Sequence, residues 1–207
     1  MQKKKIGEGW QYTTYDLENG RVLKKFHSIF KLYWVILKDI FPFQEDSLFK
    51  IVGFARASKR KAIASFKILK KNNIPLAWIG NPKFLDNLDY EQDKVKPLHN
   101  VFAESNTVTI KSIIDQFIIL NKQLLQKGII DKSFNITKNY GIDKNDKLIL
   151  IDIGELFDSL ESIRNQIMRR AWDKHYVAGC IKDKEAREHF IKKMDENFGL
   201  KSNDENL

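Results

Sequence analysis

The chain has 207 residues, of which 43% are hydrophobic and 30% charged, with 14 Phe and 4 Trp, so it can bury a core and is not a disordered polymer. Its single cysteine, Cys180, excludes an internal disulfide framework and a paired-cysteine metal site, which favours a reducing, cytoplasmic compartment. Lys and Arg exceed Asp and Glu by 9, and this excess favours an anionic partner: nucleotide phosphates, nucleic acid or an acidic membrane surface.

The N-terminal segment predicts three antiparallel strands, Lys4–Glu8, Trp10–Leu17 and Arg21–Phe26, where aromatic residues and Thr are frequent. Asn19-Gly20 separates the last two strands and is the strongest short signal for a hairpin. Both central residues of a type I′ turn have positive φ, which Asn and Gly tolerate. We therefore expect a hairpin with a type I′ turn at this position.

An apolar segment and a basic segment follow the strands. Residues 29–43 are interrupted by charged residues and a proline and fall short of the roughly 20 residues that span a bilayer. The residues before them do not have the pattern of a signal peptide, so export is not expected. Ala55–Asn72 has a helical pattern with seven Lys and Arg residues and no acidic one. The pair predicts a protein that also associates with the inner, anionic face of a membrane; a helix packed on the sheet with a solvated charged face explains the same pattern. The residues that would contact the membrane are Phe30, Trp34, Ile40, Phe41 and Lys59–Lys61.

The second half of the chain predicts more helix than strand. Its clearest element is an amphipathic helix that ends at a glycine, a residue that caps helix C-termini. The expected elements are short strands within residues 76–103, a central helix over Lys111–Lys127 capped by Gly128, strands over Phe134–Ile142 and Lys147–Ile151, helices over Leu160–Tyr176 and Lys184–Asn197, and a disordered tail over Lys201–Leu207.

Two N-terminal motifs suggest a phosphate site. Gly7 and Gly9 form a Gly-x-Gly turn before a strand, where the absence of a Cβ lets backbone N–H groups approach phosphate oxygens. Lys24 follows Arg21-Val22-Leu23 on the third strand and shares a face with Val22, so it can point into a cleft. The structural alternatives are an ordinary tight turn and a surface strand that ends in two lysines.

Two C-terminal residues are expected to meet at one end of a β-hairpin. Asp152 ends the apolar run Leu148–Ile151, and Asn139 lies 13 residues earlier, across an expected β-hairpin. Such a hairpin brings both side chains to one end, and a charged residue that closes an apolar run needs a partner, for which a metal is one choice. The alternative is an aspartate and an asparagine that stabilise turns.

These motifs, in this order, resemble the protein-kinase-like superfamily over roughly Lys4–Leu156. The basic insertion after Lys24 is distantly similar to bacterial kinases of lipopolysaccharide core sugars. The resemblance implies an α+β, bilobal protein-kinase-like fold, with a small β-rich N-lobe (about 1–103) and a reduced helical C-lobe (about 104–200) in one domain over 1–200. It also implies ATP and Mg²⁺ as cofactors, with Gly7 and Gly9 over the phosphates, Lys24 on the α- and β-phosphates, and Asn139 and Asp152 on the metal.

Two departures from the family bear on activity. The family places its catalytic Asp five residues before the metal-binding Asn, and Phe134 stands there. Asp131, eight residues before Asn139, is the nearest acid and becomes the candidate base if a longer loop brings it to the cleft. The basic helix also lacks a Glu for Lys24, for which Glu45 or Asp46 would substitute.

Three functions are therefore compared. One is an ATP-dependent kinase that phosphorylates a protein or sugar hydroxyl, and the second is a pseudokinase that binds nucleotide or a protein partner without turnover. The third, a nucleic-acid-binding module, is not expected, because the chain contains no recognisable nucleic-acid motif.

Overall fold

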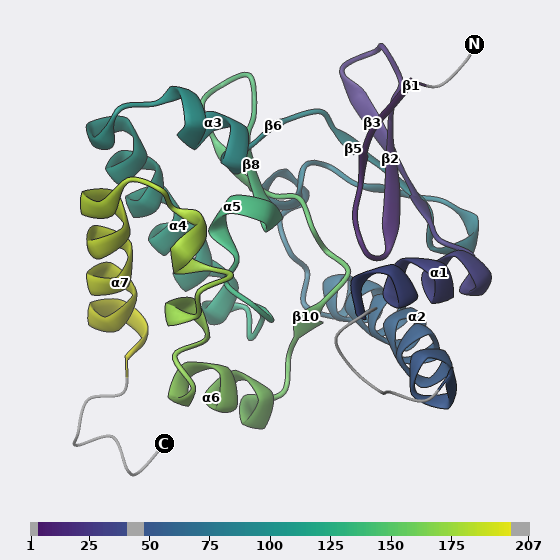
Figure 1. Cartoon of the computed structure of the whole chain (residues 1–207). Helices are drawn as coiled ribbons and strands as arrows, with labels where there is room; N and C mark the ends of the chain where they lie inside the picture. Colours follow the sequence, from purple (N-terminus) through teal and green to yellow (C-terminus); the bar gives the residue numbers. More distant parts are fainter. Residues whose placement is uncertain (1–3, 41–47, 200–207) are drawn as a thin grey trace.

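The structure, a computed structural model, describes residues 4–40 and 48–199. The side chain of Ile40, Phe41, Glu45, Asp46 and the tail Lys201–Leu207 lie outside the described residues. The N-terminal part forms an antiparallel sheet in the order β1-β2-β3-β5-β4, with two helices beside it (Figure 1). The strands are β1 (Lys4–Glu8), β2 (Tyr12–Asp16), β3 (Arg21–Phe26), β4 (Lys83–Phe84) and β5 (Tyr90–Asp93).

The expected hairpin joins β2 and β3, but its turn is not type I′. Positive φ angles occur at Glu18 (59°) and Gly20 (78°), not at Asn19. Asn19 instead uses its side chain, whose Oδ1 accepts a hydrogen bond from Arg21 N at 3.1 Å. Asp16 Oδ1 accepts from Glu18 N at 3.0 Å. These side-chain acceptors fix a longer turn than the dipeptide alone predicts.

Helices α1 (Ile29–Ile40) and α2 (Leu48–Lys71) pack against each other and beside the sheet. The ring of Phe66 on α2 lies 4.7 Å from Phe84 and 5.7 Å from Tyr90, centre to centre, and so anchors α2 on the sheet. The second helix begins seven residues before the predicted Ala55. It continues through Gly53, because an exposed helical glycine costs only about 1 kcal/mol relative to alanine.

The prediction of short strands across residues 76–103 was only partly correct. Residues 76–79 form a 3₁₀ turn, and β6 (Lys96–Pro97) leads directly into helix α3 (Leu98–Glu104), where a strand was expected. Pro97 stands at the N-cap of α3, and Leu98 behind it is fully buried. Proline is preorganised for a helix start, and burial of the helix face outweighs the strand-like composition.

The C-terminal part is built around helix α4 (Thr107–Gln126), which begins earlier than predicted and ends before Gly128, whose φ is +73°. Phe117 on α4 packs on Phe190 of α7 (Lys184–Phe198) at 5.8 Å. One hydrophobic core runs from the N-terminal sheet through these helices. The remaining elements are β7 (Ile130–Asp131), α5 (Ile136–Asn139), β8 (Tyr140–Ile142), β9 (Leu148–Leu150), β10 (Leu156–Phe157) and α6 (Leu160–Met168).

Two C-terminal predictions were wrong in extent. The strand expected over Phe134–Ile142 is confined to β8, because the helical turn α5 precedes it. The helix expected over Leu160–Tyr176 ends at Met168. Beyond it, Arg170 has a φ of 46°, and the fully buried Trp172 donates from Nε1 to Asp195 Oδ1 at 3.0 Å. Docking of this indole ends the helix.

The antiparallel sheets and the helices place the chain in the α+β class. Within residues 4–40 and 48–199, no helix combines the length and the apolar character needed to cross a bilayer.

Candidate functional site

A cavity of about 1600 Å³ lies where the N-terminal sheet meets the C-terminal part, and we call it the central cavity. It is lined by the β1–β2 turn, strand β3, the segment from β7 to α5 and the residues that follow β9. All six residues singled out from the sequence line it: Gly7, Gly9, Lys24, Asp131, Asn139 and Asp152.

The β8–β9 hairpin brings Asn139 and Asp152 together. Tyr140 pairs with Leu150 at the end of the ladder, so the residues just outside it face each other. The carbonyl of Asn139 accepts hydrogen bonds from Ile151 N at 2.7 Å and from Asp152 N at 3.2 Å. The Asp152 side chain is exposed, and its Oδ1 accepts from Gly154 N at 3.2 Å. An exposed carboxylate therefore lies beside the Asn139 amide.

Asp131 is the most enclosed acid of the site, with only 1% of its surface exposed. Asn139 Nδ2 donates to both carboxyl oxygens, at 3.0 and 3.1 Å, and the backbone N–H groups of Ser133 and Asn135 donate at 3.4 and 3.2 Å. Burial raises the pKa of Asp131 to about 7, the hydrogen bond from Asn139 opposes this, and the charge of Asp152 adds to it. This carboxyl can therefore exchange a proton near neutral pH.

The loop between β7 and α5 explains how Asp131 reaches Asn139 across eight residues. Phe134 has a φ of 50° and is fully buried, with ring centres 5.8 Å from Trp172 and 5.8 Å from Phe198. Phe134, five residues before Asn139, is therefore a core residue. The chain reverses at this phenylalanine, so the acid that faces the cavity lies three residues earlier.

Lys24 extends from β3 to the far side of the cavity. Its Nζ donates a hydrogen bond to the carbonyl of Ile151 and lies 5.7 Å from the ring centre of Tyr90. Burial lowers the pKa of Lys24, and the charge of Asp152 opposes that shift. The lysine is thus placed near the Asp152 carboxylate. The carboxylates proposed as its partners, Glu45 and Asp46, lie outside the described residues.

Gly7 lies near the end of β1, where it pairs with Thr14, and Gly9 lies in the turn that follows; we call residues 7–9 the glycine turn. The fold itself does not require glycine at either position. Neither has a positive φ, and a Cβ at either would meet protein atoms no closer than 3.8 Å. Between them, Glu8 forms an ion pair with Lys31 of α1, and hydrogen bonds from Lys31 and Lys5 lower the pKa of Glu8 to about 2. This pair attaches the turn to α1, and no sequence motif indicated it.

Glu155 was also missed from the sequence, although it lies only three residues after Asp152. It accepts from Lys61 of α2 at 3.2 Å and from Lys132, next to Asp131, at 2.8 Å. Burial raises its pKa, but the hydrogen bonds and charges of these lysines outweigh burial and lower it. We call Lys61, Glu155 and Lys132 the α2 junction.

Besides the α2 junction, a polar contact joins α2 to the residue pair that follows the glycine turn. Gln11 Nε2 donates to Ser58 Oγ at 3.1 Å, and the Gln11 side chain lies against Gly154, where a Cβ would approach Gln11 Oε1 to 2.0 Å. Gly154 is therefore required by close packing. Helix α2 contacts the segments that carry Gly9, Asp131 and Asp152, although it supplies no carboxylate to Lys24 in the described structure.

No protein-family model and no curated protein sequence matches the chain. Solved structures with a similar fold exist. One is described as the complex structure of Rv3197-erythromycin from Mycobacterium tuberculosis, with a TM-score of 0.50 and 11% identity over 93% of this chain and 53% of that chain. Another, a medium-resolution structure of the bifunctional kinase-methyltransferase WbdD, has a TM-score of 0.46 and 12% identity over 89% of this chain and 43% of that chain. The chain thus spans about half the length of these structures. The first likeness concerns the fold alone, and nothing is concluded from the second, whose TM-score is lower.

Proposed function

We propose that the protein is a small kinase-like phosphotransferase that binds ATP and Mg²⁺ in the central cavity. The observation that carries this proposal is the meeting of Lys24, Asp131, Asn139 and Asp152, from three separate segments, around one cavity. In this proposal the N-terminal sheet with α1 and α2 is the N-lobe and the rest is the C-lobe. We propose a lobe boundary near residue 97, earlier than the predicted residue 103, which the packing of α3 on α5 and β8 supports.

The side chains available suit a magnesium-bound nucleotide. Mg²⁺ prefers oxygen ligands and is commonly held by one or two carboxylates together with substrate phosphates. Asp152 offers an exposed carboxylate, and Asn139 donates through Nδ2 to Asp131, which leaves its Oδ1 for a cation. Bound there, the ion would neutralise charge on the phosphates. Lys24 would bind the α- and β-phosphates, and the Gly7 and Gly9 turn would cover them through backbone N–H groups.

Asp131 is the proposed general base. It would accept the proton of the acceptor hydroxyl while Asn139 holds its carboxyl in place. A base acts best when its pKa lies near the working pH, and the pKa of about 7 meets this condition.

A second candidate function, a pseudokinase scaffold, is favoured by one observation. Both oxygens of Asp131 are already engaged by the chain's own N–H groups, and only 1% of the residue is exposed. A general base must come within about 3 Å of the proton that it removes. A scaffold would keep this network as internal support and bind nucleotide or a protein without turnover.

Release of γ-phosphate from ATP separates the two candidates. The purified protein with Mg²⁺ is expected to release phosphate. Asp131→Asn should lower the rate by at least about 100-fold, the usual contribution of a general base, and Asp152→Ala should lower it as strongly because it removes a carboxylate that holds the metal. Asp146→Asn is the matched control, because this exposed turn aspartate makes no side-chain contact in the described structure and Asn tolerates its φ of 57°. Nucleotide binding without Asp152-dependent phosphate release would leave the scaffold as the function.

A further inference from the structure

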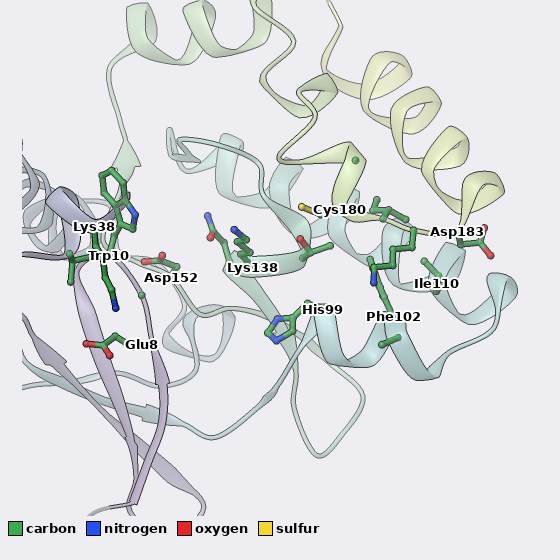
Figure 2. Close-up of a pocket in the computed structure, with 18 of the residues that line it drawn as sticks. Glu8, Trp10, Lys38, His99, Phe102, Ile110, Lys138, Asp152, Cys180 and Asp183 are labelled. Atoms are coloured by element: carbon green, nitrogen blue, oxygen red, sulfur yellow. The ribbon is translucent and has the colours of Figure 1, made fainter. Parts of the chain in front are cut away.

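A second cavity, of about 1950 Å³, continues from the central one away from Lys24, and we call it the lateral cavity. The two share Asn139, Asp152 and the glycine turn as walls. Figure 2 shows Trp10 and Lys38 on the side of the strands, Phe102 and Ile110 on the side of the C-terminal helices, and Asp152 and Lys138 between them. A molecule in the lateral cavity would therefore present its near end to Asp152 and Asn139.

The charged groups of the lateral cavity leave an excess of positive charge. Lys38, Lys138 and Lys182 come from α1, α5 and the segment before α7, all are exposed, and none forms an ion pair within the described part of the chain. The other two carboxylates of the lateral cavity, Glu8 and Asp183, already have partners within the chain. Glu8 pairs with Lys31, and Asp183 caps α7 while accepting from Thr107 Oγ1 at 2.6 Å.

The wall between these lysines is apolar. Trp34, on the face of α1 turned away from the core, is 55% exposed, and Phe102 and Ile110 belong to α3 and the first turn of α4. Aromatic and aliphatic side chains with a few separated charges are typical of sites that bind a ligand with an apolar group and a charged group. The three lysines come from three elements, so an anionic group at different places along this wall has a cation on its side of the cavity.

We propose that the lateral cavity binds the phosphate acceptor, and that this acceptor is a small hydroxyl compound that carries both an anionic group and an apolar group. This inference rests on the proposed function and names its substrate class. In the reaction, the hydroxyl oxygen forms a bond to the γ-phosphorus of ATP while the bond from that phosphorus to the β,γ-bridging oxygen breaks. ADP leaves, and the hydroxyl proton goes to Asp131.

Binding can be measured without turnover, with octyl phosphate below its micelle concentration as the probe. It should raise the melting temperature and change the tryptophan fluorescence, because Trp10 and Trp34 line the cavity. Inorganic phosphate tests the anionic group alone, and octyl glucoside tests the apolar group without charge. Both should bind at least about tenfold more weakly, since each lacks one of the two contributions. Equal binding of octyl phosphate and either partial probe would overturn the proposal.

Two substitutions test whether octyl phosphate binds in the lateral cavity. Lys38→Glu and Trp34→Ala should each weaken octyl phosphate binding about fivefold, because one cation or one partly exposed aromatic ring contributes on the order of 1 kcal/mol. Lys127→Glu makes the same charge change at the other end of α4, 17 residues from Ile110 and so about 25 Å along the helix. Its effect should stay below about twofold, because salt screens charges at that distance.

The shift in melting temperature caused by Mg·ATP distinguishes a failure of this inference from a failure of the proposed function. Lys38→Glu should leave the Mg·ATP shift in melting temperature unchanged, whereas Asp152→Ala should abolish that shift. If Mg·ATP binds but octyl phosphate does not, the acceptor class is wrong and the proposed function stands. If octyl phosphate binds with equal affinity in wild type, Lys38→Glu and Lys127→Glu, the lateral cavity is not its site.

Discussion

The carboxyl of Asp131 links the candidate chemistry to stability in a way that can be measured without a substrate. Its pKa rises from 3.8 to about 7 on folding, so the folded state binds the proton more tightly than the unfolded chain. The stabilisation is complete below about pH 4 and is lost as pH rises to about 7. Between about pH 5 and 7 this amounts to roughly 3 kcal/mol, at 1.36 kcal/mol per pH unit.

The variant Asp131→Asn resembles the protonated carboxyl and removes this dependence. Between about pH 5 and 8, the free energy of urea unfolding should rise by roughly 3 kcal/mol in the variant relative to wild type. Asp146→Asn should show no such change. A constant difference between Asp131→Asn and wild type at both pH values would mean that Asp131 titrates normally.

At the residue scale, sequence reasoning succeeded where local pairing positions the side chain. Asn139 and Asp152 flank a hairpin, and the spacing across it is enough to predict that they meet. Glu155 and Glu8 were missed because their partners, Lys61 and Lys31, come from helices whose placement depends on tertiary packing. No spacing along the chain encodes such contacts.

Among the elements, α2 is the one whose position the site depends on most. Its contacts with Gln11 and Glu155 connect it to the glycine turn and to the segment after Asp152. Part of its positive charge, which the sequence alone presented as a solvated or membrane-facing surface, forms ion pairs with other segments of the chain at the protein surface. Lys61 and Lys71 pair with Glu155 and Asp158.

Glu155→Gln should disturb nucleotide positioning more than stability. It removes the negative charge between Lys61 and Lys132, so these lysines repel each other and α2 shifts relative to Asp152. We expect the KM for ATP to rise about fivefold, with a free energy of unfolding lowered by about 1 kcal/mol, because each pair is partly exposed.

Asp158→Asn is the matched control, because it breaks another α2 ion pair, to Lys71 at 3.3 Å, which is remote from the central cavity. Its KM for ATP should equal that of wild type. Equal KM values in both variants would show that the α2 junction only stabilises the fold.

Element prediction failed mainly where burial outweighs local composition. The residues of α3 have strand-like composition, yet Leu98 is fully buried and the segment is helical. The helix from Leu160 stops early because Trp172 docks on Asp195. By contrast, α4 follows its pattern closely because it buries one regular face, and the first three strands form near their predicted bounds because they pair with one another in sequence order.

For the molecule as a whole, α1 leaves an aromatic surface uncovered. Phe30 is 71% exposed and Trp34 55% exposed, whereas Leu32 on the opposite face is buried. Burial in the fold therefore explains the apolar residues on the Leu32 face of α1, but not those on the opposite face. We propose that Phe30, which does not line the lateral cavity, contacts an anionic membrane surface.

Phe30→Ser should weaken sedimentation with phosphatidylglycerol vesicles about tenfold, because it removes one insertable ring. Neutral phosphatidylcholine vesicles should bind neither protein. The contribution of positive charge to vesicle binding is tested with Lys59→Glu. Lys61 is not used because it belongs to the α2 junction. Wild-type protein that stays in the supernatant with both lipids would withdraw the membrane proposal.

Calorimetric titration with Mg·ATP is the most direct measurement of whether the central cavity binds nucleotide. The account predicts saturable binding by wild type and by Asp146→Asn, and a loss of at least about tenfold in affinity in Asp152→Ala and in Lys24→Met, since each removes a charge that contacts phosphates or metal. Binding should also weaken when Mg²⁺ is chelated. Absence of binding by the folded wild type at millimolar Mg·ATP, or identical affinities in all four proteins, would contradict it.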